Sequence, residues 1–163
     1  MALTKGRELH KIAEKYLMND PDWSYGIMPP LYSNFRALKA ILDRKVASVH
    51  AVEYPLYSER LKTAGSVDLV ATWGGYAEDQ TGGEMTVVDF KTSKRPKQEK
   101  HILSYFVQAT TYALMFEEMY KCPRIEDIVV IIIIDQQMIQ AFHKQAKDYY
   151  NIVEAIFPMR EMR

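Results

Sequence analysis

The feature that most constrains the fold is an unbroken apolar run, IVVIIII, at residues 128–134. A run of β-branched residues with no polar alternation is typical of a strand that is buried on both faces. It is far shorter than the ~20 apolar residues needed to cross a membrane, and it stops at Asp135. The sequence therefore predicts a central strand in a sheet that carries helices on both faces.

The rest of the chain alternates helical and strand patterns in an order that fits such a sheet. Helical spacing begins with residues 9–17, where Thr4 is a candidate N-cap, and returns at 31–44, 99–121 and 145–158. Strand patterns occupy residues 49–58, 66–73 and 84–91, expected to form a meander, and 139–143, expected at an edge. We expect one domain, residues 1–163, of the α/β class, with a mixed sheet of about five strands flanked by helices.

Charge and cysteine content narrow the function classes. Lys plus Arg equals Asp plus Glu at 21 each, so any nucleic-acid binding must rely on a local patch. The single cysteine, Cys122, excludes an internal disulfide, a cysteine-based zinc site and a four-cysteine iron–sulfur cluster held by one chain. Because the N-terminus enters a helical pattern with no apolar leader, we expect a cytoplasmic protein of a bacterial or phage-infected cell, without membrane association.

Two charges interrupt the strand pattern MTVVDFKTSKR of residues 85–95. Asp89 and Lys91 stand two residues apart and therefore share one face of the strand. Such a pair forms either a structural ion pair or half of a catalytic site.

A third charge, Asp68, interrupts the preceding strand pattern, GSVDLVATW. If Trp73 pairs with Glu84 across an antiparallel hairpin, Asp68 falls opposite Asp89, where like charges repel. A hard cation such as Mg²⁺ or Mn²⁺ would relieve that repulsion, because such ions prefer oxygen ligands. The alternative is that each charge pairs with a surface partner, but three such groups within apolar strands favour catalysis.

These stretches, GSVD followed by VVDFKTSK, resemble the core of the PD-(D/E)XK nuclease superfamily. The helix GRELHKIAEKYL resembles the G-x-x-x-H helix of its RecB-type branch, and QATTY resembles the Gln-x-x-x-Tyr motif of that branch. Order and spacing are most similar to the mitochondrial genome maintenance exonuclease family and related phage exonucleases. The resemblance implies a restriction-endonuclease-like core in which Asp68, Asp89 and Lys91 are catalytic.

The same resemblance implies a ligand set. Mg²⁺ or Mn²⁺ would be held by His10, Asp68, Asp89 and the backbone carbonyl of Phe90, while Lys91 acts on the attacking water. Gln108 and Tyr112, four residues apart on one helix face, would support the site and contact the nucleic-acid backbone. Without the resemblance, His10 reads as an ordinary helix histidine and the Gln108–Tyr112 pair as amphipathic packing.

Several further residues are candidates for the site or its surroundings. Glu53, in VEYPLYS, is an additional acid, although an exposed strand glutamate is the favoured interpretation. The segment KTSKRPKQEK suggests a phosphate-binding rim made by Lys94, Arg95 and Lys97. The aromatic segment 23–42 could stack on bases or pack against a second copy of the chain in a homo-oligomer.

The expected function is hydrolysis of DNA by a metal-dependent exonuclease that favours single strands or free ends. One alternative is a structure-selective endonuclease on the same metal core. Another is a noncatalytic DNA-binding or assembly protein that keeps the fold, against which the complete set of His10, Asp68, Asp89 and Lys91 argues.

Overall fold

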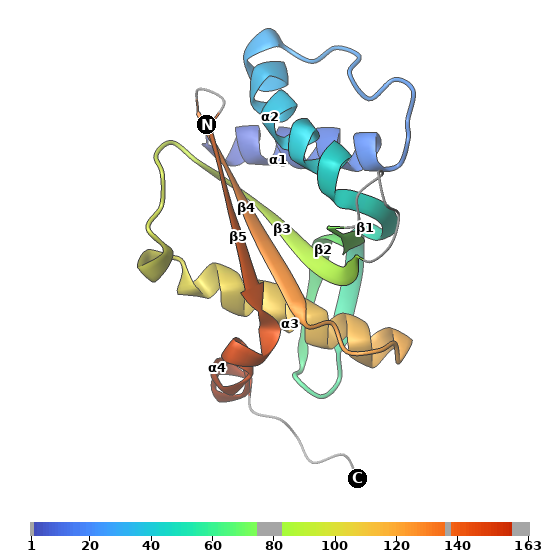
Figure 1. The fold of residues 1–163 in the computed structure, drawn as a ribbon, viewed down its shortest axis with the longest axis vertical. Helices are drawn as coiled ribbons and strands as arrows, with labels where there is room; N and C mark the ends of the chain where they lie inside the picture. The colour runs from blue at the N-terminus through green and yellow to red at the C-terminus, as the bar shows by residue number, and fades with distance from the viewer. Residues whose placement is uncertain (1, 75–82, 136–137, 158–163) are drawn as a thin grey trace.

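A five-stranded mixed sheet, in the order β1-β2-β3-β4-β5, forms the middle layer of the computed structural model (Figure 1). The structure describes residues 2–74, 83–135 and 138–157. Its strands are β1 (Val46–Ser58), β2 (Thr63–Trp73), β3 (Glu84–Ser93), β4 (Asp127–Ile134) and β5 (Met138–Gln145). Its α-helices are α1 (Ala2–Leu17), α2 (Pro29–Lys45), α3 (Leu103–Tyr120) and α4 (Tyr150–Ile156), with short 3-10 helices at Glu99–His101 and Ala146–Tyr149.

The strand connections agree with the predicted order. Strands β1, β2 and β3 form an antiparallel meander, β4 pairs in parallel with β3 after the α3 crossover, and β5 pairs antiparallel at the edge. The prediction that residues 128–134 are central is wrong by one position, since β3 lies in the middle and β4 is fourth. The α/β class with about five strands is confirmed.

Strand β4 is nevertheless buried on both faces, as its sequence predicts. Its even-numbered residues 128–134 join the core beneath α3, while its odd-numbered residues 129–133 join the core beneath α1 and α2. Figure 1 shows this layering, with α1 and α2 above the sheet and α3 and α4 below it. Among the described helices, none has both the length and the apolar character to cross a bilayer.

Element boundaries differ from the predicted ones in specific places. Helix α1 begins at Ala2, so Thr4 lies inside it and is not its N-cap. Strand β2 starts at Thr63, within the predicted turn. The predicted helix of residues 99–121 is a 3-10 turn followed by α3, which ends where Lys121 adopts φ 49°. Pro158, the predicted end of the last helix, lies outside the described residues.

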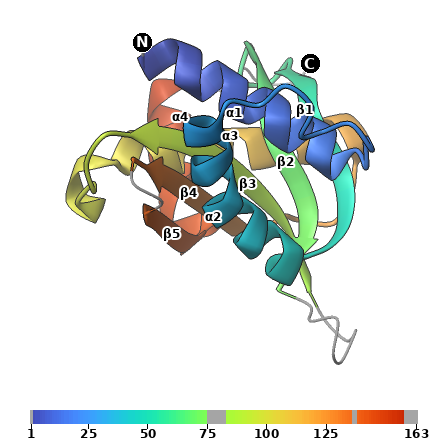
Figure 2. The same ribbon diagram turned by 90° about the horizontal axis from the view of Figure 1, so that it is seen from above.

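Strands β2 and β3 separate from each other partway along their length. Five residue pairs join them, from Trp73↔Glu84, as predicted, to Leu69↔Val88. Beyond Leu69, β2 continues beside β1, and beyond Val88, β3 continues beside β4. Figure 2 shows the two strands diverging from their connecting loop. The strands therefore form a fork, which opens at the level of Asp68 and Asp89.

The aromatic segment that follows α1 contributes mainly to packing. Trp23 stacks on Tyr32 and contacts the rings of Tyr16 and Phe35, and Phe35 is fully buried. Of these, Trp23 and Phe35 are committed to the core beneath α1 and α2. Tyr25, 88% exposed, and Tyr32, 37% exposed, are the aromatic residues of this segment that remain open to a base or a partner.

Candidate metal and catalytic site

Asp68 contacts groups from two other elements at the fork. Its Oδ2 accepts a hydrogen bond of 2.7 Å from the backbone N–H of Phe90, which takes the place of a backbone ladder bond. The same oxygen lies 3.2 Å from Nε2 of His10. Asp68 is buried, and these two contacts hold its carboxylate in place.

Helix α1 presents His10 to this oxygen because Gly6 lets the helix approach β3. A Cβ atom at Gly6 would lie 3.3 Å from Oγ1 of Thr92, which is a tight contact. The Gly6 carbonyl lies 2.7 Å from Nδ1 of His10. A neutral imidazole that donates Nδ1–H to this carbonyl keeps its Nε2 lone pair for a metal. The G-x-x-x-H spacing thus sets the position of His10 and, when the imidazole is neutral, favours the tautomer that carries its proton on Nδ1.

Glu53 also enters the site, and the favoured interpretation of it as an exposed strand residue is wrong. In β1, Val52 pairs with Leu69 and Tyr54 with Val67, which leaves Glu53 opposite Asp68. Glu53 is half-buried and has φ 44°, in the left-handed region that few non-glycine residues adopt. This local kink, which interrupts the β1 ladder, brings the carboxylate toward Asp68 and His10.

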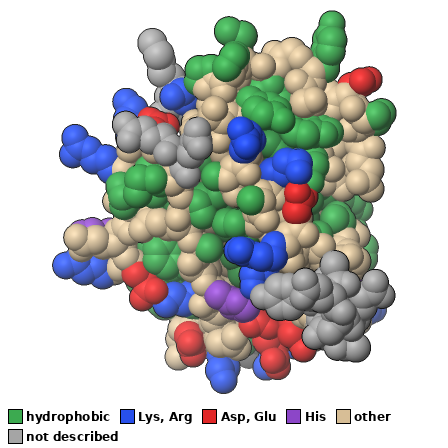
Figure 3. Space-filling view, turned by 45° about the horizontal axis from the view of Figure 1, so that its top comes forward, with side chains coloured by type: hydrophobic (Ala, Val, Ile, Leu, Met, Phe, Trp, Pro, Cys, Tyr) green, Lys and Arg blue, Asp and Glu red, His purple; other side chains and the backbone are tan. Residues whose placement is uncertain are grey.

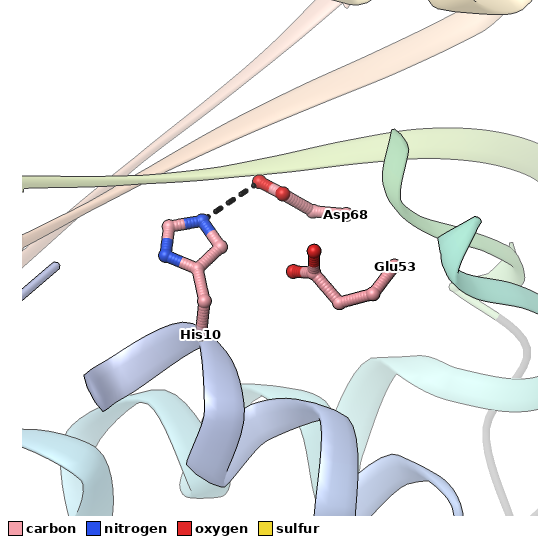
Figure 4. Close-up of side chains that lie close together, drawn as sticks. All are labelled: His10, Glu53 and Asp68. Atoms are coloured by element: carbon pink, nitrogen blue, oxygen red, sulfur yellow. Dashed lines mark hydrogen bonds and ion pairs between the residues drawn. The ribbon is translucent and has the colours of Figure 1, made fainter. Parts of the chain in front are cut away.

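The three side chains converge from α1, β1 and β2 (Figure 4). One ligand atom from each of His10, Glu53 and Asp68 lies within 4.8 Å of the others. Two carboxylate oxygens and an imidazole nitrogen suit a divalent ion such as Mn²⁺ or Mg²⁺. Asp89, which is 3% exposed, is not among these three, but its Oδ2 has no well-directed hydrogen bond. The donors therefore fit a metal, with Asp89 next to them.

On the other side of the fork, Asp89 starts a chain of polar contacts that leads to α3. Its Oδ2 lies 3.0 Å from Nζ of Lys91, and that amine donates to Oε1 of Gln108 at 2.5 Å. Gln108 in turn donates from Nε2 to the hydroxyl of Tyr112 at 3.1 Å. The ring of Tyr105 lies 5.1 Å from Nζ of Lys91. The chain holds the Lys91 amine beside the carboxylates.

Crowded carboxylates shift the pKa values of the site. Burial and the charge of Asp68 raise the pKa of Asp89 to about 7, against the opposing effect of Lys91. Burial and the same charge raise the pKa of Glu53 to about 7. For His10, burial acts to lower the pKa, but the hydrogen bond and charge of Asp68 outweigh it and raise the pKa to about 9. The fork thus holds more negative charge than its own cations balance.

A cavity of about 670 Å³ gives access to the His10 side of the fork. His10, Glu53 and Thr92 line it together with two cations that the sequence analysis missed, Arg7 and Lys11. Arg7 lies three residues before His10 and four before Lys11, and side chains at these two helical spacings are neighbours, so helical periodicity could have indicated both cations.

The predicted rim of Lys94, Arg95 and Lys97 lies elsewhere. All three side chains are exposed, and none lines the cavity. The backbone N–H and carbonyl of Lys97 both bond to the side chain of Gln140 in β5. The rim therefore lies beyond the end of β3, beside the sheet edge.

Comparison with known proteins agrees with this geometry. Residues 34–157 match the PD-(D/E)XK nuclease superfamily. The match includes β1 to α4 and therefore Glu53, Asp68, Asp89 and Lys91, but it leaves out α1 and His10. A search of curated proteins found no significant match. Since the matched residues cover most of the chain and carry the acid, acid and lysine pattern at the fork, the chain belongs to the PD-(D/E)XK nuclease superfamily.

Proposed function

We propose that the protein is a metal-dependent DNA exonuclease that hydrolyses phosphodiester bonds and favours single strands or free ends. The observation that carries the proposal is the meeting of His10, Glu53 and Asp68 on one side of the fork with Asp89 and Lys91 on the other. Members of this superfamily are divalent-metal nucleases, and the donors here suit Mg²⁺ or Mn²⁺.

A divalent ion at this site would lower the pKa of water and neutralise charge on the scissile phosphate. The ligands would be His10 through Nε2, Asp68, Asp89 and Glu53, and the Phe90 carbonyl remains a predicted ligand. Gln108 orients the Lys91 amine, so that this amine can direct the attacking water and stabilise charge that develops on the phosphate. Tyr112 fixes Gln108 in turn.

The preference for ends rests on the resemblance of two motifs to RecB-type exonucleases. The G-x-x-x-H helix places His10 against Asp68, and the Gln-x-x-x-Tyr motif connects to Lys91. Both contacts fit the roles that the resemblance implies for His10 and Gln108, and they support the exonuclease proposal over a noncatalytic role. Lys94, Arg95 and Lys97 remain a proposed second contact surface for the strand.

End-labelled linear DNA and closed circular DNA, each single- and double-stranded, separate the candidate activities. We expect mononucleotides or short products from linear DNA with Mg²⁺ or Mn²⁺, and no product with EDTA. Intact circles would support the exonuclease, whereas cut circles would identify an endonuclease. If neither the wild type nor Asp89→Asn cleaves any of these substrates, the noncatalytic alternative is supported.

A further inference from the structure

We propose that Arg7 and Lys11 of α1 form a phosphate-binding site for the nucleic acid, beside the metal ligands and on the opposite side of the fork from Lys91. The inference rests on the proposed function, because it takes the substrate to be a nucleic-acid strand. It identifies the residues that would hold a phosphate next to the one being cut.

The placement of both cations follows from the helix that carries His10. Residues 7, 10 and 11 lie within about one turn of α1, so their side chains leave the helix on neighbouring paths. Arg7 and Lys11 line the same cavity as His10 and Glu53. A strand whose scissile phosphate lies at the fork would therefore pass these two cations as it leaves on the α1 side.

Within the part of the chain that the structure describes, neither cation has a partner that would occupy it. Among the described residues, Arg7 and Lys11 make no ion pair, hydrogen bond or ring contact with another side chain, and both are exposed. Lys5, on the same helix, instead lies 3.8 Å from a carboxylate oxygen of Asp135. A free guanidinium is well suited to grip two oxygens of one phosphate, and a lysine adds a compact charge.

The charge balance of the molecule makes these two local cations important for binding a phosphate. The net formal charge is zero, and the face seen in Figure 3 shows Lys and Arg side chains interspersed with acidic and hydrophobic ones. With a net charge of zero the molecule has no overall positive charge to attract DNA, so binding must come from local groups. Glu14 and Glu53 on the cavity wall repel phosphate. Arg7 and Lys11 are the cations placed to offset them.

A solvated helix face is the competing explanation, and Lys15 provides the matched control. Lys15 is also an exposed lysine of α1, one turn beyond Lys11, but it does not line the cavity. Alanine is a strong helix former, so substitution at these exposed positions should preserve α1. The variants are therefore Arg7→Ala/Lys11→Ala, the charge-preserving Arg7→Lys/Lys11→Arg, and Lys15→Ala.

The experiment measures binding of labelled single-stranded DNA by fluorescence anisotropy in EDTA at several salt concentrations. The double alanine variant should bind about tenfold more weakly, with a salt slope reduced by about 1.4, because each single-strand phosphate contact contributes about 0.7. The charge-preserving variant should keep most of the affinity, and Lys15→Ala should match the wild type. Oligonucleotides with and without terminal phosphates then distinguish the source of the phosphate. A loss confined to phosphorylated ends assigns a terminal phosphate, and an equal loss assigns an internal one.

Cleavage assays in Mn²⁺ keep this inference separate from the proposed function. If the wild type cuts DNA and the double alanine variant binds with unchanged affinity and salt slope, the phosphate site is overturned while the nuclease stands. A loss in Lys15→Ala as large as in the double variant would also overturn it. If the wild type binds through Arg7 and Lys11 but cuts nothing, the phosphate site stands and the hydrolytic function falls. If the wild type neither binds nor cuts DNA, both fall.

Discussion

Lys91 contacts both a buried carboxylate and an amide, and these contacts predict different effects on binding and turnover. In Lys91→Ala we expect kcat to fall by about 100-fold or more, because a positioned amine acts in the transition state. Metal affinity should be kept or increased, since removing a cation 3.0 Å from Asp89 leaves that carboxylate freer to bind an ion. Single-turnover rates and metal titrations would measure the two effects, with Lys15→Ala as control. Unchanged turnover would remove Lys91 from the mechanism.

Asp89→Asn tests whether the buried carboxylate is there for structure or for metal. Burial and Asp68 raise its pKa from 3.8 to about 7. The wild-type protein therefore loses stability as the pH rises toward about 7. The Asp89→Asn variant does not lose this contribution, because asparagine does not titrate. In EDTA at pH 8 we expect the variant to melt at the same temperature as the wild type or higher, with a smaller difference at pH 6.

Activity of this variant should collapse at either pH, and its melting temperature should respond little to Mn²⁺. The measurement is a pair of melting curves with a Mn²⁺ titration. A variant that melts several degrees lower in EDTA, with no response to metal in either protein, would make Asp89 the structural partner of Lys91.

The sequence predicted some of these residues and missed others for physical reasons. The hairpin register that brings Asp68 opposite Asp89 follows from the pairing of Trp73 with Glu84, and the structure has that pairing. Glu53 was misjudged because its position depends on φ 44°, and a glutamate gives no local signal for that conformation. The contacts of Lys91 with α3 are long-range, and only the family resemblance suggested them.

At the scale of elements, the packing of β2 against α3 helps to position the Lys91 amine. Gly65 of β2 leaves room for the ring of Tyr112, whose hydroxyl accepts a hydrogen bond from Gln108, and Gln108 accepts one from Lys91. A Cβ atom at Gly65 would lie 3.0 Å from Cε1 and 3.4 Å from the hydroxyl oxygen of Tyr112. In Gly65→Ala we therefore expect a loss of about 1–3 kcal/mol in stability from overpacking, together with a lower kcat. In a Tyr112→Ala background the same change should cost much less, because the obstructing ring is gone.

A double-mutant cycle by urea unfolding measures this coupling. The matched control is Gly74→Ala, where the added Cβ meets no atom within 4 Å among the described residues beyond its chain neighbours, so a loss from its φ of 92° should not depend on Tyr112. Additive losses for Gly65 and Tyr112 would show that α3 and β2 do not press on each other at this point.

The order of helices and strands was predictable because each hydrophobic pattern spans many residues. The ends of the elements and the position of each strand in the sheet depend on tertiary contacts. Strand β2 starts early, at Thr63, since β1 pairs with it down to Ser58↔Thr63. The rank of β4 depends on the parallel crossover through α3, which sets it beside β3 and leaves β5 at the edge. The local sequence shows the hydrophobic period of a strand, but it does not show which strand will lie beside it in the sheet.

At the scale of the whole molecule, helices cover both faces of the sheet, and the fork between β2 and β3 brings the charged side chains of the site together. Helices α1 and α3 lie on opposite faces of the sheet (Figure 1). Helix α1 supplies His10, which contacts Asp68, and α3 supplies Gln108, which contacts Lys91. The apolar run of β4 makes this possible, because a strand buried on both faces requires both layers. The same burial raises the pKa values of the carboxylates that the fork brings together.

The pH dependence of stability should therefore weaken or reverse when metal is added. In EDTA, three groups act in the same direction. Asp89 and Glu53 have folded pKa values of about 7, above their ordinary values, and His10 has one of about 9. A raised pKa contributes stability at low pH that is lost as pH rises through the folded value. The melting temperature should thus fall between pH 6 and pH 9, with Asp89 and Glu53 contributing up to about pH 7 and His10 from its ordinary pKa of 6.5 up to about 9.

Metal binding requires the deprotonated forms of the same groups, so Mn²⁺ affinity should rise over this range and the melting temperature in Mn²⁺ should fall less or increase. Melting curves from pH 6 to pH 9, with EDTA or Mn²⁺, test this, and His10→Ala/Glu53→Gln provides the comparison. The double variant should have a flatter EDTA profile, because two of the three groups with raised pKa values are gone, and a smaller response to Mn²⁺. Parallel profiles of the wild type with and without metal would show that these groups do not share an ion.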